Sequence, residues 1–342
     1  MRAISVFVMI AIVATAAFAF SAANNVSYPY HSERFTRFVN ESYSVNCAKG
    51  TTDFYTWMEK AYKSSNRAYP GKEKLGLESL MYAKRLDFDR IKNANIKTTA
   101  QINFASWLHR TIKTIIPRFS LDRGFEFCNV VRYGERQCFL QSVLIAGLLQ
   151  RAGVNAGVVM VYKNIRGEQT NNGHAVVLVK LPDKKDIIVD ASEPEPFARQ
   201  RGLFVRTMDY RYVDPVYEDK SDKIRCFKPS SGSGKIETAR VKTLDTAFLD
   251  SQFWYYRGER ANGGLLASKK THEGLEKSAR CFETSMKRCP QNPLTVYMLG
   301  RVYLDQGRTA LARQTLYRAK SLYMRFGWVP EGLRVFLAKA RG

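Results

Sequence analysis

The sequence contains few of the residues from which metal and cofactor sites are built. Among its 342 residues only four are histidines and six are cysteines. It has no HExxH motif, no pair of CxxC motifs and no glycine-rich phosphate loop. We therefore expect neither a metal ion nor an organic cofactor.

Acidic residues are scarce relative to basic ones. The chain has 31 Asp and Glu against 54 Lys and Arg, a formal net charge of +23. This balance suits an anionic surface polymer as a partner, although a solvated basic surface accounts for it without one. The basic residues form no block interleaved with aromatics and no zinc-finger spacing, so we expect no specific binding of nucleic acid.

Long hydrophobic runs are absent except for one, from Ala3 to Phe20. A single positive charge precedes this run, and small residues after it offer cleavage sites behind Ala19 or Ala23. This pattern resembles a secretory signal peptide over residues 1–23, and it predicts an exported protein, secreted or periplasmic. An uncleaved membrane anchor is the alternative, because a spanning helix needs only about 20 residues.

The middle of the chain combines helical and strand patterns. Apolar residues recur at three- and four-residue intervals in 73–116, and again from residue 139 to a stop at Gly153. Runs rich in β-branched residues follow and predict three strands, at 156–164, 174–181 and 186–192. A helix followed by strands indicates an α+β unit and not a parallel α/β one.

The C-terminal third has a repeat pattern. The Ser/Gly-rich stretch "KPSSGSGK" at 228–235 indicates a linker. After it, the 34-residue tetratricopeptide pattern is matched at Leu299, Gly300, Tyr303, Gly307, Ala312, Leu316 and Ala319. The same frame, 33 residues earlier, predicts a second, degenerate repeat at Leu266, Ala267, Gly274 and Ala279. A generic helical hairpin is the alternative interpretation of this pattern.

Cys138 stands directly in front of the helix predicted from residue 139, in the stretch "ERQCFLQSVLIAGLLQRAG". At a helix N-terminus the unpaired N–H groups and the helix dipole favour the thiolate over the thiol. The same N–H groups are donors for the oxyanion of an acyl-transfer reaction. Cys138 is therefore the candidate nucleophile.

His174 and Asp190 are the candidate partners of this thiol. His174 opens one predicted strand, and Asp190 ends the next. Antiparallel pairing centred near Pro182 puts the two residues opposite each other, where the carboxylate can orient the imidazole. His31, His109 and His272 lie in an irregular stretch or within helical patterns, which suit a base less well.

Four segments around these residues resemble the transglutaminase-like superfamily, which carries Cys, His and Asp in this order on a papain-like core. They are "YGERQC" (133–138), "LLQRAGVNAGVV" (148–159), "GHAVV" (173–177) and "VDAS" (189–192). Val176 and Ala191 depart from the family, which usually has an aromatic residue and a proline at these places. The resemblance implies thiol chemistry on an amide: Cys138 attacks the carbonyl, His174 moves the proton and Asp190 fixes the imidazole.

The cysteines give no disulfide framework. Setting Cys138 aside leaves five, an odd number, although export would permit disulfides. Cys281 and Cys289 lie eight residues apart on one predicted helix, about 12 Å along its axis, which is too far for a bridge. The sequence therefore assigns no disulfide.

These observations predict an α+β fold with a papain/transglutaminase-like core, a helical N-terminal region and a C-terminal tetratricopeptide-like helical domain. The predicted boundaries are a signal peptide at 1–23, a mostly helical region at 24–99, the catalytic core at 100–225, a linker at 226–245 and repeats at 246–342. The expected function is a thiol enzyme acting on an amide of a protein or peptide, with hydrolysis by a protease or amidase favoured over cross-linking. The alternative is a non-catalytic binding protein that contacts a protein partner through its repeats and uses the core as a scaffold.

Overall fold

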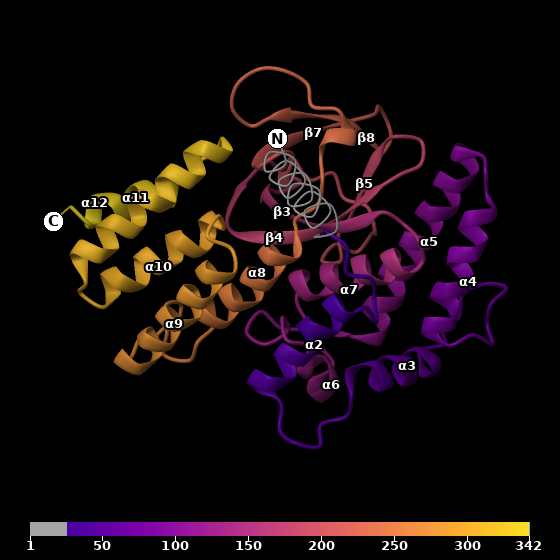
Figure 1. The fold of residues 1–342 in the computed structure, drawn as a ribbon, viewed down its shortest axis with the longest axis horizontal. Coiled ribbons are helices and arrows are strands. Elements are labelled where there is room, and N and C mark those ends of the chain that lie inside the picture. Colours follow the sequence, from indigo (N-terminus) through magenta and orange to yellow (C-terminus); the bar gives the residue numbers. More distant parts are fainter. Residues whose placement is uncertain (1–25, 342) are drawn as a thin grey trace, which may run out of the picture.

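The computed structural model describes residues 26–341, without the side chains of residues 171 and 172. Within that range it contains eleven α-helices and eight strands (Figure 1). The predicted signal peptide lies outside the described residues. No helix of residues 26–341 is both long and apolar enough to cross a membrane.

The N-terminal helices form a layer beside and beneath the sheet region (Figure 1). They are α2 (Glu33–Asn46), α3 (Phe54–Ser64), α4 (Leu77–Arg90) and α5 (Ala94–Ile115). Ser32, Asp53 and Asn93 cap the first, second and fourth of these helices through side-chain oxygens that accept backbone N–H groups. The short α6 (Phe127–Tyr133) follows and packs on α2.

The central helix α7 (Cys138–Arg151) lies between this layer and the sheet (Figure 1). Every residue from Cys138 to Leu149 is buried. A helix that is apolar on all sides has to be enclosed by other elements. Here α4 and α5 pack on one side and strands β3 and β4 on the other.

Six antiparallel strands form a closed barrel in the order β3-β4-β5-β8-β7-β6. Their bounds are β3 (Ala156–Lys163), β4 (Gln169–Lys180), β5 (Asp186–Val189), β6 (Gly202–Arg206), β7 (Tyr210–Tyr217) and β8 (Ile224–Pro229). Alternate residues of β3, such as Val159 and Val161, form a small apolar cluster with residues of the other barrel strands. Their neighbours Val158 and Met160 belong to the main core that the helices share.

The predicted papain-like α+β core is therefore wrong. The first three strands were recognised from their β-branched runs, but β6, β7 and β8 close the sheet into a barrel. These three strands are short, carry charged residues and include Pro215 and Pro229, features that weaken a strand pattern in the sequence. The class remains a mixture of helix and strand, with a barrel at its centre.

The C-terminal region is helical. After the 3-10 helix Thr238–Arg240 it contains α8 (Thr246–Glu259), α9 (His272–Arg288), α10 (Pro293–Asp305), α11 (Thr309–Phe326) and α12 (Glu331–Lys339). Leu299, Gly300 and Leu316 of the repeat pattern are buried where α10 packs on α11. Of the degenerate second repeat, Gly274 and Ala279 are buried on α9, which packs on α8, whereas Leu266 and Ala267 fall in the loop between these two helices. The second repeat stays a prediction.

The range predicted as a linker contains the end of β8 and the 3-10 helix. Helix α8, which the sequence assigned to the repeats, packs on the start of α7. The ring of Phe139 lies 4.8 Å from that of Phe253, and buried Arg257 pairs with Glu126 at 2.7 Å. The division of the chain into domains stays a prediction, but α8 shares the main apolar core with α7.

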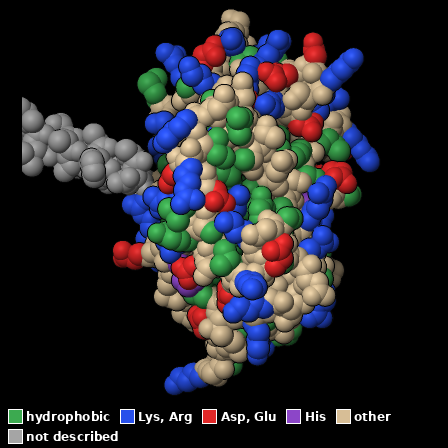
Figure 2. All heavy atoms as spheres, turned by 90° about the vertical axis from the view of Figure 1, so that its right-hand side faces the viewer, with side chains coloured by type: hydrophobic (Ala, Val, Ile, Leu, Met, Phe, Trp, Pro, Cys, Tyr) green, Lys and Arg blue, Asp and Glu red, His purple; other side chains and the backbone are tan. Residues whose placement is uncertain are grey.

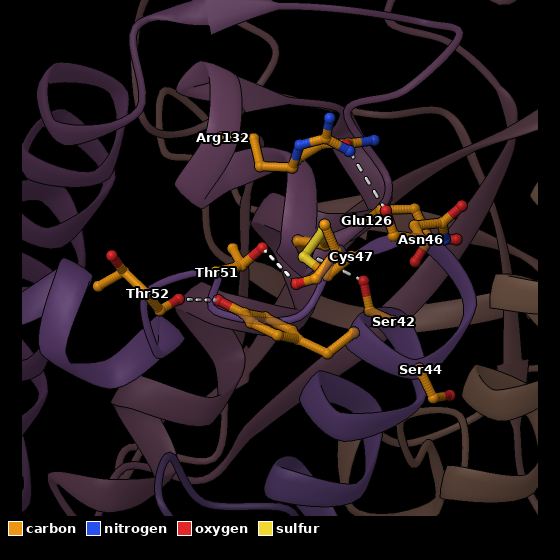
Figure 3. Close-up of a disulfide and its surroundings, with 12 residues drawn as sticks. Ser42, Ser44, Asn46, Cys47, Thr51, Thr52, Glu126 and Arg132 are labelled. Atoms are coloured by element: carbon orange, nitrogen blue, oxygen red, sulfur yellow. Dashed lines mark hydrogen bonds between the residues drawn. A yellow bond between two sulfur atoms is a disulfide. The ribbon is translucent and has the colours of Figure 1, made fainter.

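A disulfide joins Cys47, which caps the C-terminus of α2, to Cys128 in the first turn of α6 (Figure 3). Their Cα atoms are 5.8 Å apart, and the residues are 81 apart in the sequence. The sequence assigned no disulfide pairing, because local spacing cannot show that α2 and α6 meet. Ser42 reinforces the junction by accepting a 3.1 Å hydrogen bond from the Cys128 N–H.

Basic side chains are spread over the face of the molecule that carries α4 and α5. Figure 2 shows the face that carries α4 and α5, where Lys and Arg side chains lie around the margins with acidic side chains among them. The anionic surface polymer therefore stays a prediction based on net charge.

Candidate active site

The chain is held tightly just before Cys138. Gly134 ends α6 in the left-handed conformation, with φ of 63°, and the two-residue strand β2 (Glu135–Arg136) then pairs in parallel with β1 (Arg118–Phe119). Buried Arg136 donates from Nε to the Ile116 carbonyl at 2.5 Å and from Nη1 to the Gln141 side chain at 3.2 Å. These bonds fix the point at which α7 begins.

Cys138 is the first residue of α7, which begins one residue before the predicted start, and follows the extended Gln137. The thiol residue is 9% exposed and lines a cleft of about 290 Å³. The first N–H groups of a helix have no partner within it, so they surround this position. The sulfur thus lies at a positive helix end and is reachable from the cleft.

His174 comes from β4, which packs on α7. Ser142, one turn after Cys138, donates a 3.0 Å hydrogen bond to the carbonyl of Ala175. This bond fixes the register of α7 against the strand at the residue next to His174. The His174 side chain is 23% exposed and lines the same cleft as Cys138.

Asp190 lies 2.8 Å from His174, measured from Oδ2 to Nε2. The hairpin register differs by two residues from the predicted one: Val177 pairs with Val189, which sets residue 176, not His174, opposite Asp190. Residues 174 and 190 are diagonal neighbours on one face of the hairpin. The side chains of a histidine and an aspartate are long enough to meet across this diagonal. The structure therefore brings together all three predicted site residues.

The electrostatics of the site favour a protonated His174 beside an ionised Asp190. Burial lowers the pKa of His174, but its hydrogen bonds to Asp190 and to Cys138, with the charges of both, outweigh burial and raise the pKa to about 10. Because Nε2 contacts Asp190, the ring nitrogen left for Cys138 is Nδ1. Burial raises the pKa of Asp190, yet its bonds to His174 and other donors produce a net lowering.

Three residues that the sequence did not single out for this role support Asp190. Gln200 donates from Nε2 to Oδ2 at 2.7 Å, and the N–H of Ser192 donates to Oδ1 at 2.9 Å. The fully buried His109 lies with Nε2 3.1 Å from the Asp190 carbonyl. Burial and then the charge of Lys113 lower the pKa of His109, so the neutral ring donates to that carbonyl.

The cleft wall includes residues from the C-terminal region. Tyr256 and Glu259 of α8, with Arg260 just after it, line the cleft beside Cys138 and His174. Phe119 and Leu121 stand at the cleft with 53% and 49% exposure. No local sequence signal marks Tyr256, because it reaches Cys138 only through the packing of α8 on α7.

The other candidate residues lie elsewhere. His31 stacks on Tyr55 with ring centroids 3.8 Å apart, and His272 is the first residue of α9. Burial raises the pKa of Cys281 and raises that of Cys289 to about 11, which favours the unreactive thiol form. These thiols, with the buried Cys226, provide internal references for Cys138.

The chain matches no protein-family model, and no curated protein is significantly similar to it in sequence. A function therefore has to be argued from the geometry of the cleft.

Proposed function

We propose that the chain is an exported thiol enzyme that acts on an amide bond of a protein or peptide through Cys138, His174 and Asp190. The supporting observation is the imidazole of His174, which contacts the Asp190 carboxylate at 2.8 Å and hydrogen-bonds the thiol at the start of α7. The resemblance of the surrounding segments to the transglutaminase-like superfamily is consistent with this chemistry.

In the proposed reaction the Cys138 thiolate attacks the amide carbonyl carbon and forms a C–S bond. The negative charge on the carbonyl oxygen is stabilised by N–H groups at the start of α7. The His174 imidazolium then protonates the leaving nitrogen as the C–N bond breaks, and ammonia or an amine departs. The neutral imidazole then takes a proton from water as the water oxygen bonds to the thioester carbon. The C–S bond breaks, which releases the acid and regenerates the Cys138 thiolate and the His174 imidazolium.

Hydrolysis is proposed over cross-linking. A cleft of about 290 Å³ is near the lower end of the range for ligand sites, roughly 300–1,000 Å³. Such a space suits one side chain or a short peptide segment with water. A cross-linking reaction also needs a bound second amine.

Export is supported by two features. Residues 1–23 resemble a signal peptide, and disulfides such as Cys47–Cys128 persist mainly in oxidising compartments. The C-terminal helices offer a surface for a protein partner, which is proposed on the repeat pattern of α10 and α11.

The test is the rate at which each free cysteine of the folded protein reacts with iodoacetamide at pH 6–7, followed by mass spectrometry. Cys138 should react far faster than Cys226, Cys281 and Cys289. His174→Ala should slow it strongly, because the imidazolium is lost, and Asp190→Asn should slow it less. If Cys138 reacts no faster than the three references, the enzyme proposal fails and a non-catalytic binding protein takes its place.

A further inference from the structure

Tyr256 is fixed against the first turn of α7. Its ring stacks on Phe125 with centroids 5.6 Å apart and lies 5.5 Å from the ring of Phe139, the residue that follows Cys138. The residue is only 2% exposed, yet it lines the cleft. Its position relative to the thiol is therefore set by aromatic packing on both sides.

The Tyr256 hydroxyl is a protonated donor in this cleft. It donates to the carbonyl of Gly173, the residue before His174, over a long 3.3 Å. Burial first, and then the negative charge of Cys138, raise the pKa of Tyr256 well above its ordinary value. The hydroxyl thus keeps its proton and lies between the start of α7 and the start of the His174 segment.

A thiol that adds to a carbonyl needs donors at the oxygen where negative charge develops. The N–H groups at the start of α7 provide donors on one side only. A hydrogen bond to an oxyanion is shorter and stronger than one to a neutral carbonyl, so the long bond to Gly173 is readily exchanged. Tyr256 has the required chemistry and lies in the same small cleft.

We propose that the Tyr256 hydroxyl donates a hydrogen bond to the carbonyl oxygen of the bound acyl group while the Cys138 sulfur adds to it. Helix α8 of the C-terminal region then supplies a catalytic residue. This inference rests on the proposed function, since it requires Cys138 to be the nucleophile.

The test compares two reactions of the same thiol in the full chain. With p-nitrophenyl acetate, a C–S bond forms at the carbonyl, an oxyanion develops, and the C–O bond breaks to release p-nitrophenolate. With iodoacetamide, sulfur displaces iodide from a CH₂ carbon and no oxyanion develops. A Cys138→Ser chain gives the blank for both reactions.

Tyr256→Phe should lower the rate of Cys138 acetylation by about tenfold or more, as loss of an oxyanion donor does. Its alkylation rate should stay within about twofold of wild type. Tyr303→Phe is the matched control: its hydroxyl donates to Glu283 at 2.8 Å, and neither of these residues lines the cleft. That variant should leave the ratio of the two rates unchanged.

If Tyr256→Phe lowers the acetylation and alkylation rates equally, Tyr256 is a positioning residue and the proposal is overturned. The proposal is also overturned if neither rate changes. If wild-type Cys138 reacts no faster than the other free cysteines with either reagent, the proposed function itself fails. If wild-type Cys138 is alkylated fast but Tyr256→Phe leaves the ratio of its acetylation rate to its alkylation rate unaltered, only the role of Tyr256 fails.

Discussion

The side-chain amide of Gln200 donates a 2.7 Å hydrogen bond to Oδ2 of Asp190, the oxygen that also contacts the His174 ring. Gln200 is 2% exposed and follows Asp190 by ten residues in the sequence. One carboxylate oxygen thus serves two donors from different segments. The amide therefore restrains the carboxylate that contacts the imidazole.

Gln200→Leu should weaken this arrangement while nearly preserving volume. The Asp190 carboxylate would lose a buried donor that lowers its pKa. We expect Cys138 alkylation to slow by about three- to tenfold and the free energy of unfolding to fall by about 1–3 kcal/mol. Labelling rates and urea unfolding measure the two effects, and unchanged labelling would show that Gln200 has no part in orienting His174.

The pH dependence of Cys138 alkylation follows from the raised pKa of His174. Burial alone would lower the pKa of His174, but hydrogen bonds to Asp190 and Cys138 keep the ring protonated up to a pH of about 10. We therefore expect no step in the alkylation rate near pH 6.5, where an ordinary imidazole loses its proton. A step near pH 6.5 that His174→Ala abolishes would contradict the raised pKa of His174.

Removal of the disulfide should destabilise the fold. Replacing Cys47 and Cys128 together by Ser opens a loop of 81 residues, and loss of a native disulfide typically costs about 2–5 kcal/mol. The midpoint of urea unfolding should fall accordingly. A reductant should lower the midpoint of the wild type but leave that of the double variant unchanged, and equal midpoints for both proteins would argue against the Cys47–Cys128 pair.

Gly300→Val should disrupt the packing of α10 on α11. A Cβ at Gly300 would lie 2.7 Å from two side-chain carbons of Leu316, which is buried. Overpacking of this kind costs about 1–3 kcal/mol. Ala310→Val, on the exposed face of α11, is the control and should cost under about 1 kcal/mol in urea unfolding.

The parts of the site that the sequence predicted are those with local signals. A Cys before a long apolar helix and a His at the start of one strand of a hairpin need only neighbouring residues to be recognised. The register error of two residues left His174 and Asp190 within reach, because an even shift keeps both on one face at the open end of the hairpin, whereas a one-residue slip would have separated them.

The parts that the sequence missed depend on contacts between distant segments. Closure of the barrel requires β6 to pair with β3 and β8 with β5, and neither pairing has a periodic pattern of its own. Gln200 and Tyr256 are polar residues whose role arises only when these segments meet Asp190 and Cys138. The Cys47–Cys128 bridge was missed for the same reason.

The packing of α8 also fixes when the cleft can form during synthesis. Tyr256 follows Cys138 by 118 residues, so Cys138 emerges from the ribosome long before helix α8, which lines the cleft beside it. Proteins generally fold from the N-terminus as they are made, at about 5–20 residues per second. A nascent chain therefore carries Cys138 for several seconds beside an unfinished wall, and the complete cleft belongs only to the finished protein.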